Sequence, residues 1–364
     1  MKLALVHDHL IQDGGAENVL RIFHDLWPEA PTYTLLYAPA AFPDFQNKKI
    51  KTSWLQKLPL ALKKYQWYLP LMPAATEGYN LSDFDVVISN SSAFSKGSIT
   101  KPGTTHICYC HTPTRYLWSD THSYVSELHA PKFIKMFLPP ILSQLRLWDH
   151  AAAQRVDLFI ANSKTVQARI KKYYGRDSII IHPPVETEKF SISSAPKKYF
   201  LVGGRLVPYK RYDLIIQAFN RTGLPLKIFG TGPIEESLKN IAKENIEFLG
   251  RISDQERTEL YANCLAFLHP QEEDFGITAV EAMAAGRPVI AYRKGGATET
   301  VVEGVTGEFF NEQIWEELAD RLIRFDETRY NPEIIKEHAE KFGVERFKNQ
   351  MRELVNKTNL SALL

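Results

Sequence analysis

Two carboxylates stand eight positions apart in the stretch "EEDFGITAVEAMAAGRPVIAY", residues 272–292. Residues 275–285 are mostly small and apolar, which predicts a short buried helix. Glu281 lies inside this predicted helix and Glu273 just before it. Because an uncompensated buried carboxylate costs several kcal/mol, Glu281 needs a partner. The spacing does not decide whether this partner is an arginine, a backbone group or a hydroxyl group of a ligand.

The start of this helix is a candidate anion site. The first N–H groups of a helix have no partner within it, and Gly276 stands at the junction of loop and helix. Two carboxylates would repel a phosphate there. We therefore interpret Glu273 and Glu281 as acceptors for hydroxyl groups, such as those of a ribose or a hexose.

A second candidate cluster is "GGRLVPYK", residues 203–210. Gly204 ends a predicted strand and lets the backbone approach a ligand. Arg205 and Lys210, five positions apart, supply one rigid and one mobile positive charge. Taken alone, this pattern favours an ordinary surface loop with two cations.

Composition limits the class of protein. The 364 residues are long enough for two domains, and 44% of them are apolar. No run approaches the roughly 20 apolar residues of a membrane span, and we interpret the N-terminal "MKLALVHDHL" as a strand. The three cysteines form neither a disulfide framework nor a paired zinc motif, which favours a reducing cytoplasm.

The net charge of +2 is unevenly distributed. Residues 1–183 contain 20 Lys and Arg against 14 Asp and Glu, and the remainder contains 24 against 28. The basic first half is suited to an anionic partner.

Strands and helices alternate in both halves, which predicts α/β layers with parallel sheets. The expected strands are short apolar runs within residues 3–7, 84–90, 105–113, 156–163, 199–206, 226–233, 246–253, 264–270 and 288–292. Residues 182–198, rich in Pro and Ser, are the candidate linker. Ligands of such sheets bind at the carboxyl ends of the strands.

Six motifs in order resemble the retaining glycosyltransferases of family 4, which have the GT-B fold. They are "GGAEN", "CHTP", "GRLVPYK", "GTGP", the two glutamates of an E-x7-E signature, and "GGATETVVEGVTG". The resemblance implies two Rossmann-like α/β/α domains facing each other across a deep cleft. Residues 1–183 would bind the acceptor and 184–345 the nucleotide sugar, and a C-terminal helix, 346–364, would pack back towards the first domain.

By this resemblance, Glu281 holds the ribose hydroxyl groups of a nucleotide and Glu273 faces the transferred sugar. Arg205 and Lys210 clamp the diphosphate, where negative charge develops as the sugar leaves. The backbone groups implied near the donor are those of Gly204, Arg251, Ile252, Phe275, Gly276, Ile277 and Thr278.

In the first half, Gly14 and Gly15 lie between a strand and a helix and do not form a G-x-G-x-x-G fingerprint. The resemblance places these glycines near the donor phosphate, and His111 near the primary hydroxyl group of the donor sugar. A lone histidine is more often structural, but the matched "HTP" favours an active-site role. Retaining relatives need no obvious protein nucleophile, and the departing phosphate is their usual base.

No cofactor or metal ion is expected, because the nucleotide sugar is the substrate and these folds work without a divalent ion. His7, Asp8 and His9 are the tempting metal ligands, but alternation points the two histidines away from the aspartate. A nucleic-acid partner is likewise not expected.

Residues 48–73 combine lysines with aromatic residues, a composition that suits an anionic bilayer surface. The lysines are Lys48, Lys49, Lys51, Lys57, Lys63 and Lys64. A second apolar stretch, 133–148, is a candidate for the same face. The patch predicts peripheral contact with the inner face of the cell membrane, and a solvated helix face over the sheet is the alternative.

Phrases such as "TSWLQKLP" and "HICYCHTPTRYLW" look closest to bacterial O-antigen and exopolysaccharide mannosyltransferases. These use GDP-mannose and a lipid-linked saccharide acceptor. The alternatives are a UDP-sugar-dependent transferase, a GT-B nucleotide-sugar epimerase or hydrolase, and a non-catalytic sugar-binding protein. An NAD-dependent oxidoreductase is disfavoured by the missing fingerprint.

Overall fold

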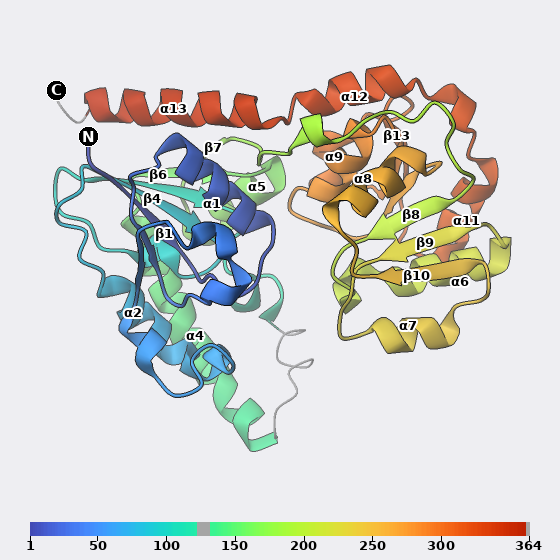
Figure 1. The fold of residues 1–364 in the computed structure, drawn as a ribbon. Helices are drawn as coiled ribbons and strands as arrows, with labels where there is room; N and C mark the ends of the chain where they lie inside the picture. The colour runs from blue at the N-terminus through green and yellow to red at the C-terminus, as the bar shows by residue number, and fades with distance from the viewer. Residues whose placement is uncertain (122–131, 362–364) are drawn as a thin grey trace. The chain divides into compact units, whose positions relative to one another are not determined.

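The computed structural model describes residues 1–121 and 132–361, which form two compact units (Figure 1). One unit contains Met1–His182 and the C-terminal segment that begins at Lys348, and the other is Pro183–Phe347. Each unit is built on its own parallel sheet, as the alternation of strands and helices predicts.

The first unit contains a seven-stranded sheet of order β3-β2-β1-β4-β5-β6-β7. Its strands are β1 Leu3–His7, β2 Thr32–Thr34, β3 Ile50–Thr52, β4 Val86–Ser91, β5 Thr105–Cys110, β6 Leu158–Ala161 and β7 Ser178–Ile180. The side chains of β1, β4 and β5 are almost entirely buried, in agreement with their continuous apolar runs.

The helices of the first unit follow its strands. They are α1 Gly15–Leu26, α2 Met72–Glu77, α4 Lys132–Gln154 and α5 Lys164–Tyr174. Helix α13, Val344–Ser361, begins in the last residues of the second unit and continues into the first. Helix α5 shows how the sequence sets its limits. The Ser163 side chain accepts a hydrogen bond from the Val166 amide at its start, and Gly175 with φ 68° ends it.

The second unit contains a six-stranded sheet of order β10-β9-β8-β11-β12-β13. Its strands are β8 Phe200–Gly203, β9 Leu226–Phe229, β10 Ile246–Gly250, β11 Phe267–His269, β12 Val289–Tyr292 and β13 Gly307–Phe310. In both sheets the strand order reverses once, between β1 and β4 and between β8 and β11. Loops diverge at such a point, which leaves room for a ligand beyond the strand ends.

The helices of the second unit cover both faces of its sheet. They are α6 Tyr212–Thr222, α7 Glu235–Ile241, α8 Asp254–Asn263, α9 Ile277–Ala284, α10 Ala297–Thr300, α11 Trp315–Arg324 and α12 Pro332–Glu340. Alternate strand residues enter two cores: Leu201 packs with α9, and Phe200 packs with α6 and α11. The apolar α9 is therefore buried, as its composition predicts.

Short 3-10 turns make up much of the remaining first unit. They include η3 Trp54–Lys57, η4 Tyr65–Leu71, η5 Ser95–Gly97 and η6 Arg115–Leu117. The second unit contains a similar turn, η8 Pro208–Lys210. In the described ranges, no helix is long and apolar enough to cross a membrane.

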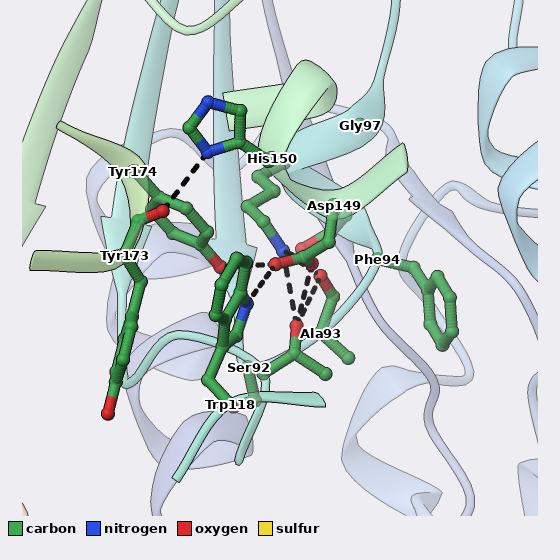
Figure 2. Close-up of polar contacts among 12 residues, drawn as sticks. Ser92, Ala93, Phe94, Gly97, Trp118, Asp149, His150, Tyr173 and Tyr174 are labelled. Atoms are coloured by element: carbon green, nitrogen blue, oxygen red, sulfur yellow. Dashed lines mark hydrogen bonds and ion pairs between the residues drawn. The ribbon is translucent and has the colours of Figure 1, made fainter. Parts of the chain in front are cut away.

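A fully buried ion pair joins distant parts of the first unit. Lys96 of η5 lies 2.5 Å from the Asp149 carboxylate of α4, and both side chains are at most 2% exposed. Figure 2 shows Trp118 and Tyr174 converging on Asp149, to which each donates a hydrogen bond of 2.8 Å. Thr114 donates a further bond at 2.8 Å. The carboxylate therefore connects η5, α4, α5 and the segment after β5.

The charge of Lys96 depends on this carboxylate. Burial alone would lower the pKa of Lys96, but the adjacent Asp149 carboxylate raises it overall. Removing one partner leaves the other as an uncompensated buried charge.

We predict that Lys96→Met lowers the free energy of unfolding of the first unit by about 3–5 kcal/mol. Urea denaturation followed by tryptophan fluorescence is the measurement, since five of the six tryptophans belong to this unit. The matched control is Lys171→Met, which removes an exposed ion pair with Asp177 and costs about 0–1 kcal/mol. Equal losses in the two variants would contradict the structural role of the buried pair.

Candidate active site

Glycine loops pack backbone against backbone at the carboxyl edge of the second sheet. The Gly204 amide donates to the Phe229 carbonyl at 3.1 Å. A Cβ atom on Gly230 would lie 1.9 Å from the Gly204 carbonyl oxygen, and one on Gly232 would lie 2.1 Å from that of Leu206. The loops after β8 and β9 therefore meet with no side chain between them.

Lys210 and Glu273 form a largely buried ion pair above these loops. The Lys210 Nζ lies 3.0 Å from the Glu273 Oε1, and the side chains are 11% and 17% exposed. Burial by itself would lower the pKa of Lys210, but the Glu273 carboxylate raises it overall. Lys210 is therefore an ammonium at neutral pH.

Gly204 provides the space for this ammonium. Its φ is 125°, a conformation that favours glycine, and a Cβ atom there would lie 3.0 Å from the Lys210 Nζ. The neighbouring Arg205 is exposed and forms no ion pair with any residue in the described ranges. One shielded and one exposed cation thus flank the end of β8.

The loop that carries Glu273 is fixed by two glycines from the turn after β12. The Gly296 amide donates to the Glu273 carbonyl at 2.8 Å. A Cβ atom on Gly295 would lie 2.3 Å from that carbonyl oxygen, and one on Gly296 would lie 2.3 Å from the Phe275 Cα. This close packing sets the position of the Glu273 backbone.

Helix α9 begins directly after this loop. Gly276 is its N-cap, with φ 89°, and supplies no side chain to the first amides of the helix. Those of Ile277 and Thr278 have no partner within the helix. The Phe275 ring is buried against Phe342, with ring centroids 5.6 Å apart, so Phe275 offers the site its backbone alone.

Glu281 has protein partners in this structure. The Tyr261 hydroxyl donates to its Oε2 at 3.1 Å, and the Arg257 guanidinium lies 3.9 Å from its Oε1. Burial raises the pKa of Glu281, and Arg257 and Tyr261 offset only part of this effect. An arginine, one of the partners that the sequence allowed for Glu281, is therefore present, and a tyrosine hydroxyl group is a second partner.

The segment after β10 borders the same edge. Gly230 donates its amide to the Gly250 carbonyl at 2.7 Å, which ties this segment to the glycine loop. Arg251 is exposed, and Ile252 packs partly into the core. Ser253 then caps α8 in a reciprocal pair of hydrogen bonds with Glu256.

The remaining predicted residues belong to the first unit. Gly14 is the extended N-cap of α1, with φ −171°, and Gly15 is the first residue of that helix. His111 follows β5, and its Nε2 lies 2.6 Å from the Asn90 Oδ1. Burial lowers the pKa of His111 to about 4, which leaves the imidazole neutral at pH 7.

Asp8 has a structural task in the first unit. Its carboxylate accepts four backbone hydrogen bonds of 2.7–2.8 Å from residues 92–95. Despite burial, these bonds and the adjacent His7 lower its pKa. Within residues 1–121 and 132–361, no group of three or more His, Cys, Asp or Glu side chains is arranged to hold a metal ion.

Several site residues escaped the sequence reasoning. Arg257 and Tyr261 come from α8, and only the pairing of α8 with α9 reveals them. His269 ends β11, is fully buried, and has its Nε2 4.0 Å from the Glu273 carboxylate. A Cβ atom on Gly276 would lie 3.1 Å from the His269 ring. The sequence could have indicated His269, because it is a histidine near the end of a predicted strand, where ligands of such sheets bind.

Two family models match the chain, one on each half. The model described as Glycosyltransferase Family 4 matches residues 13–189, and the one described as Glycosyl transferases group 1 matches residues 184–342.

Curated relatives are named as glycosyltransferases. An uncharacterized glycosyltransferase of Methanocaldococcus jannaschii is 30% identical over 197 residues, 53% of this chain and 56% of the relative. A GDP-mannose-dependent monoacylated alpha-(1-6)-phosphatidylinositol monomannoside mannosyltransferase of Corynebacterium glutamicum is 30% identical over 46% of this chain and 55% of the relative. The O-antigen chain mannosyltransferase C of Escherichia coli is 26% identical over 39% and 42%. The chain thus spans about half the length of the curated relatives it matches.

Solved structures with this fold cover nearly the whole chain. HepE of Anabaena, in complex with UDP-glucose, has a TM-score of 0.72 at 19% identity and covers 98% of this chain and 100% of its own. Sucrose-phosphate synthase from Thermosynechococcus elongatus has a TM-score of 0.75 at 16% identity, with 99% and 100% covered. The predicted GT-B fold class is confirmed.

We predict that the unliganded Glu281→Gln variant is more stable than the wild type, and that this difference in stability grows as the pH rises. The folded state holds the Glu281 proton at a pH where the unfolded chain, with a pKa near 4.5, has released it. Stability is therefore lost as the pH rises through the folded pKa, and glutamine abolishes that loss. Melting temperatures of both proteins between pH 4 and pH 8 are the measurement.

The matched control is Glu308→Gln, since burial also raises the pKa of Glu308 outside this site. It should show the same direction of change. A Glu281→Gln chain that is less stable than the wild type at pH 7 would contradict the assigned pKa direction.

Proposed function

Because this chain belongs to the family 4, group 1 glycosyltransferases, we propose that it transfers a hexose from a nucleoside diphosphate sugar with retention of anomeric configuration. The observation that carries the proposal is the Lys210–Glu273 ion pair beside Gly204. It combines a positive charge, a carboxylate and a backbone segment without a side chain at one strand end.

The diphosphate would bind at the start of α9. Arg205 is exposed and can reach an anion, while Lys210 stays charged because of Glu273. The amides of Ile277 and Thr278 add hydrogen-bond donors at the positive end of the helix dipole. These groups neutralise the negative charge that grows on the leaving diphosphate as the sugar–phosphate bond breaks.

The hydroxyl groups of the donor would bind to the carboxylates. Glu281 is held by Tyr261 and has its pKa raised by burial, so a pair of ribose hydroxyl groups would supply hydrogen bonds that favour its ionised form. Glu273 has one carboxylate oxygen on Lys210, and the transferred sugar would contact this residue. The departing diphosphate would take the proton of the acceptor hydroxyl group.

The proposed donor is GDP-mannose, and the proposed acceptor is a lipid-linked saccharide of the O-antigen or exopolysaccharide type. The names of the Corynebacterium and Escherichia coli relatives support this choice, since both are mannosyltransferases. A UDP-sugar is the second candidate, because the HepE structure is a complex with UDP-glucose.

A membrane-bound acceptor agrees with the surface formed by residues 48–73. This segment is β3 followed by 3-10 turns and the start of α2, and it forms no continuous amphipathic helix. Trp54 and Trp67 are 45% and 66% exposed, and Lys63 and Lys64 are exposed beside them in the chain. Exposed indole rings among lysines fit peripheral docking on an anionic bilayer.

The companion stretch, residues 133–148, lies in α4. Side chains of residues 132–137 and the whole of 122–131 fall outside the described part of the chain. Leu147 is exposed and Trp148 is partly buried against the core.

We predict that Lys210→Met and Arg205→Ala each raise the dissociation constant for GDP roughly 10- to 100-fold, because each removes a charge-assisted bond to phosphate. Isothermal titration calorimetry is the measurement, with GDP binding more tightly than UDP and NAD not binding. The matched control is Lys227→Met, which removes a lysine–glutamate pair from β9 of the same unit and leaves affinity unchanged. Wild-type affinity in both Arg205→Ala and Lys210→Met would overturn the phosphate assignment.

Vesicle flotation tests the docking surface. We predict that the chain floats with vesicles of anionic lipid, and that Lys63→Glu with Lys64→Glu abolishes flotation, since each basic residue contributes about 1 kcal/mol near such a surface. Lys171→Glu with Lys172→Glu makes the same charge change on exposed residues of α5 in the same unit. Should this control double variant lose binding equally, or the wild type fail to float, docking through residues 48–73 is wrong.

A further inference from the structure

Four side chains of the first unit form a row of hydrogen bonds across the point where its strand order reverses. The His111 Nε2 lies 2.6 Å from the Asn90 Oδ1, and the Asn90 Nδ2 lies 3.1 Å from the His7 Nδ1. The His7 Nε2 lies 3.0 Å from the Glu17 Oε1. His7 and Asn90 are paired directly in the β1–β4 register, and His111 follows the adjacent β5.

The orientation of the Asn90 amide is set by a backbone carbonyl. Its Nδ2 lies 2.7 Å from the carbonyl oxygen of Ala16, which can only accept a hydrogen bond. The nitrogen must therefore face Ala16, and its second N–H is directed to His7. The Oδ1 is left facing His111, where it can only accept.

This polarity assigns the protons of both histidines. The Nδ1 of His7 accepts from Asn90, so a neutral His7 carries its proton on Nε2 and donates to Glu17. His111 must donate from Nε2 to the Asn90 oxygen, so its neutral ring has a lone pair on Nδ1. No hydrogen bond to this Nδ1 forms within the described ranges.

The surroundings of His111 favour its neutral form. Burial is the main cause of its lowered pKa of about 4, and His7 lowers it further. Glu17 and Asp8 act in the opposite direction. The Tyr109 ring packs edge-on against the imidazole, with centroids 5.2 Å apart.

We propose that Asn90, supported by His7 and Glu17, is a positioning residue that keeps the His111 proton on Nε2 and presents Nδ1 as an acceptor to a sugar hydroxyl group. The choice of substrate class follows from the lone pair. A hydroxyl group can donate to Nδ1, whereas the carboxylate of a uronic acid cannot and is repelled. This specificity rests on the proposed function, because it assumes that a sugar binds beside His111.

The experiment combines nitrogen-15 NMR of histidine-labelled protein with the pH dependence of transfer. In the wild type without ligand, His111 should be neutral at pH 7 with its proton on Nε2, assigned by loss of the signal in His111→Gln. A proton on Nδ1, or a charged ring at pH 7, overturns the proposal. This spectrum does not depend on transferase activity, so it decides the proposal even when no donor is turned over.

Asn90→Asp is the diagnostic variant. A carboxylate beside His111 raises the pKa of the imidazole, so the ring becomes protonated near neutral pH and loses its acceptor. We expect kcat/KM to fall about 3- to 10-fold at low pH and to recover as the pH rises through the new pKa, because one hydrogen bond is lost and regained. The wild type should show no such step between pH 6 and pH 8.

Asn162→Asp is the matched control. Asn162 is buried at the carboxyl end of β6 in the same sheet and makes no hydrogen bond to the row. It adds the same charge without touching Asn90, so His111 should keep its wild-type spectrum. An identical shift of the His111 signals in both variants would contradict the positioning role of Asn90.

Glu17→Gln supplies a second readout that preserves the polarity of the row. The glutamine oxygen can still accept from the His7 Nε2, so the His111 proton should stay on Nε2. Movement of that proton to Nδ1 in this variant would overturn the assignment, whether or not Asn90→Asp folds.

Discussion

The ion pair between Lys210 and Glu273 is the interaction on which the candidate site depends. Each residue comes from a different loop, one after β8 and one after β11, and the Glu273 carboxylate keeps Lys210 charged although burial opposes that charge. The ion pair requires glycine at positions 204, 295 and 296, because side chains there would contact Lys210 or the backbone around Glu273. The anion-binding chemistry follows from this retained ammonium.

A geometric constraint brings the other groups to the same edge. The carboxyl ends of parallel strands lie at the same edge of a sheet, and the strand order of each sheet reverses once. In the second unit this places Gly204, Gly230, Gly250 and the start of α9 among neighbouring loops. In the first unit the same rule aligns His7, Asn90 and His111 across β1, β4 and β5. Glycine loops in one unit and polar side chains in the other thus lie at the carboxyl edge of their own sheets, where the strand order reverses.

The sequence predicted those parts of the fold that rest on local pattern. Apolar runs predicted nine strands, β1, β4 to β6 and β8 to β12, and the composition of α9 predicted a buried helix. Strands β2, β3, β7 and β13 were not predicted, because their three or four residues give little pattern. The equally short β11 was predicted because it lies in the longer apolar run of residues 264–268. The sequence could not identify the individual partners of Glu281, because Tyr261 contacts it only when α8 packs beside α9. The row from His111 to Glu17 likewise depends on strand register, which a single sequence does not reveal.

A crystal structure of the chain with a bound nucleoside diphosphate sugar tests the central claim most directly. We expect the diphosphate to lie between Arg205, Lys210 and the first amides of α9, with the ribose hydroxyl groups bound to Glu281. A diphosphate bound away from the start of α9, or a ribose that makes no contact with Glu281 and leaves it with Tyr261 and Arg257, would contradict this assignment.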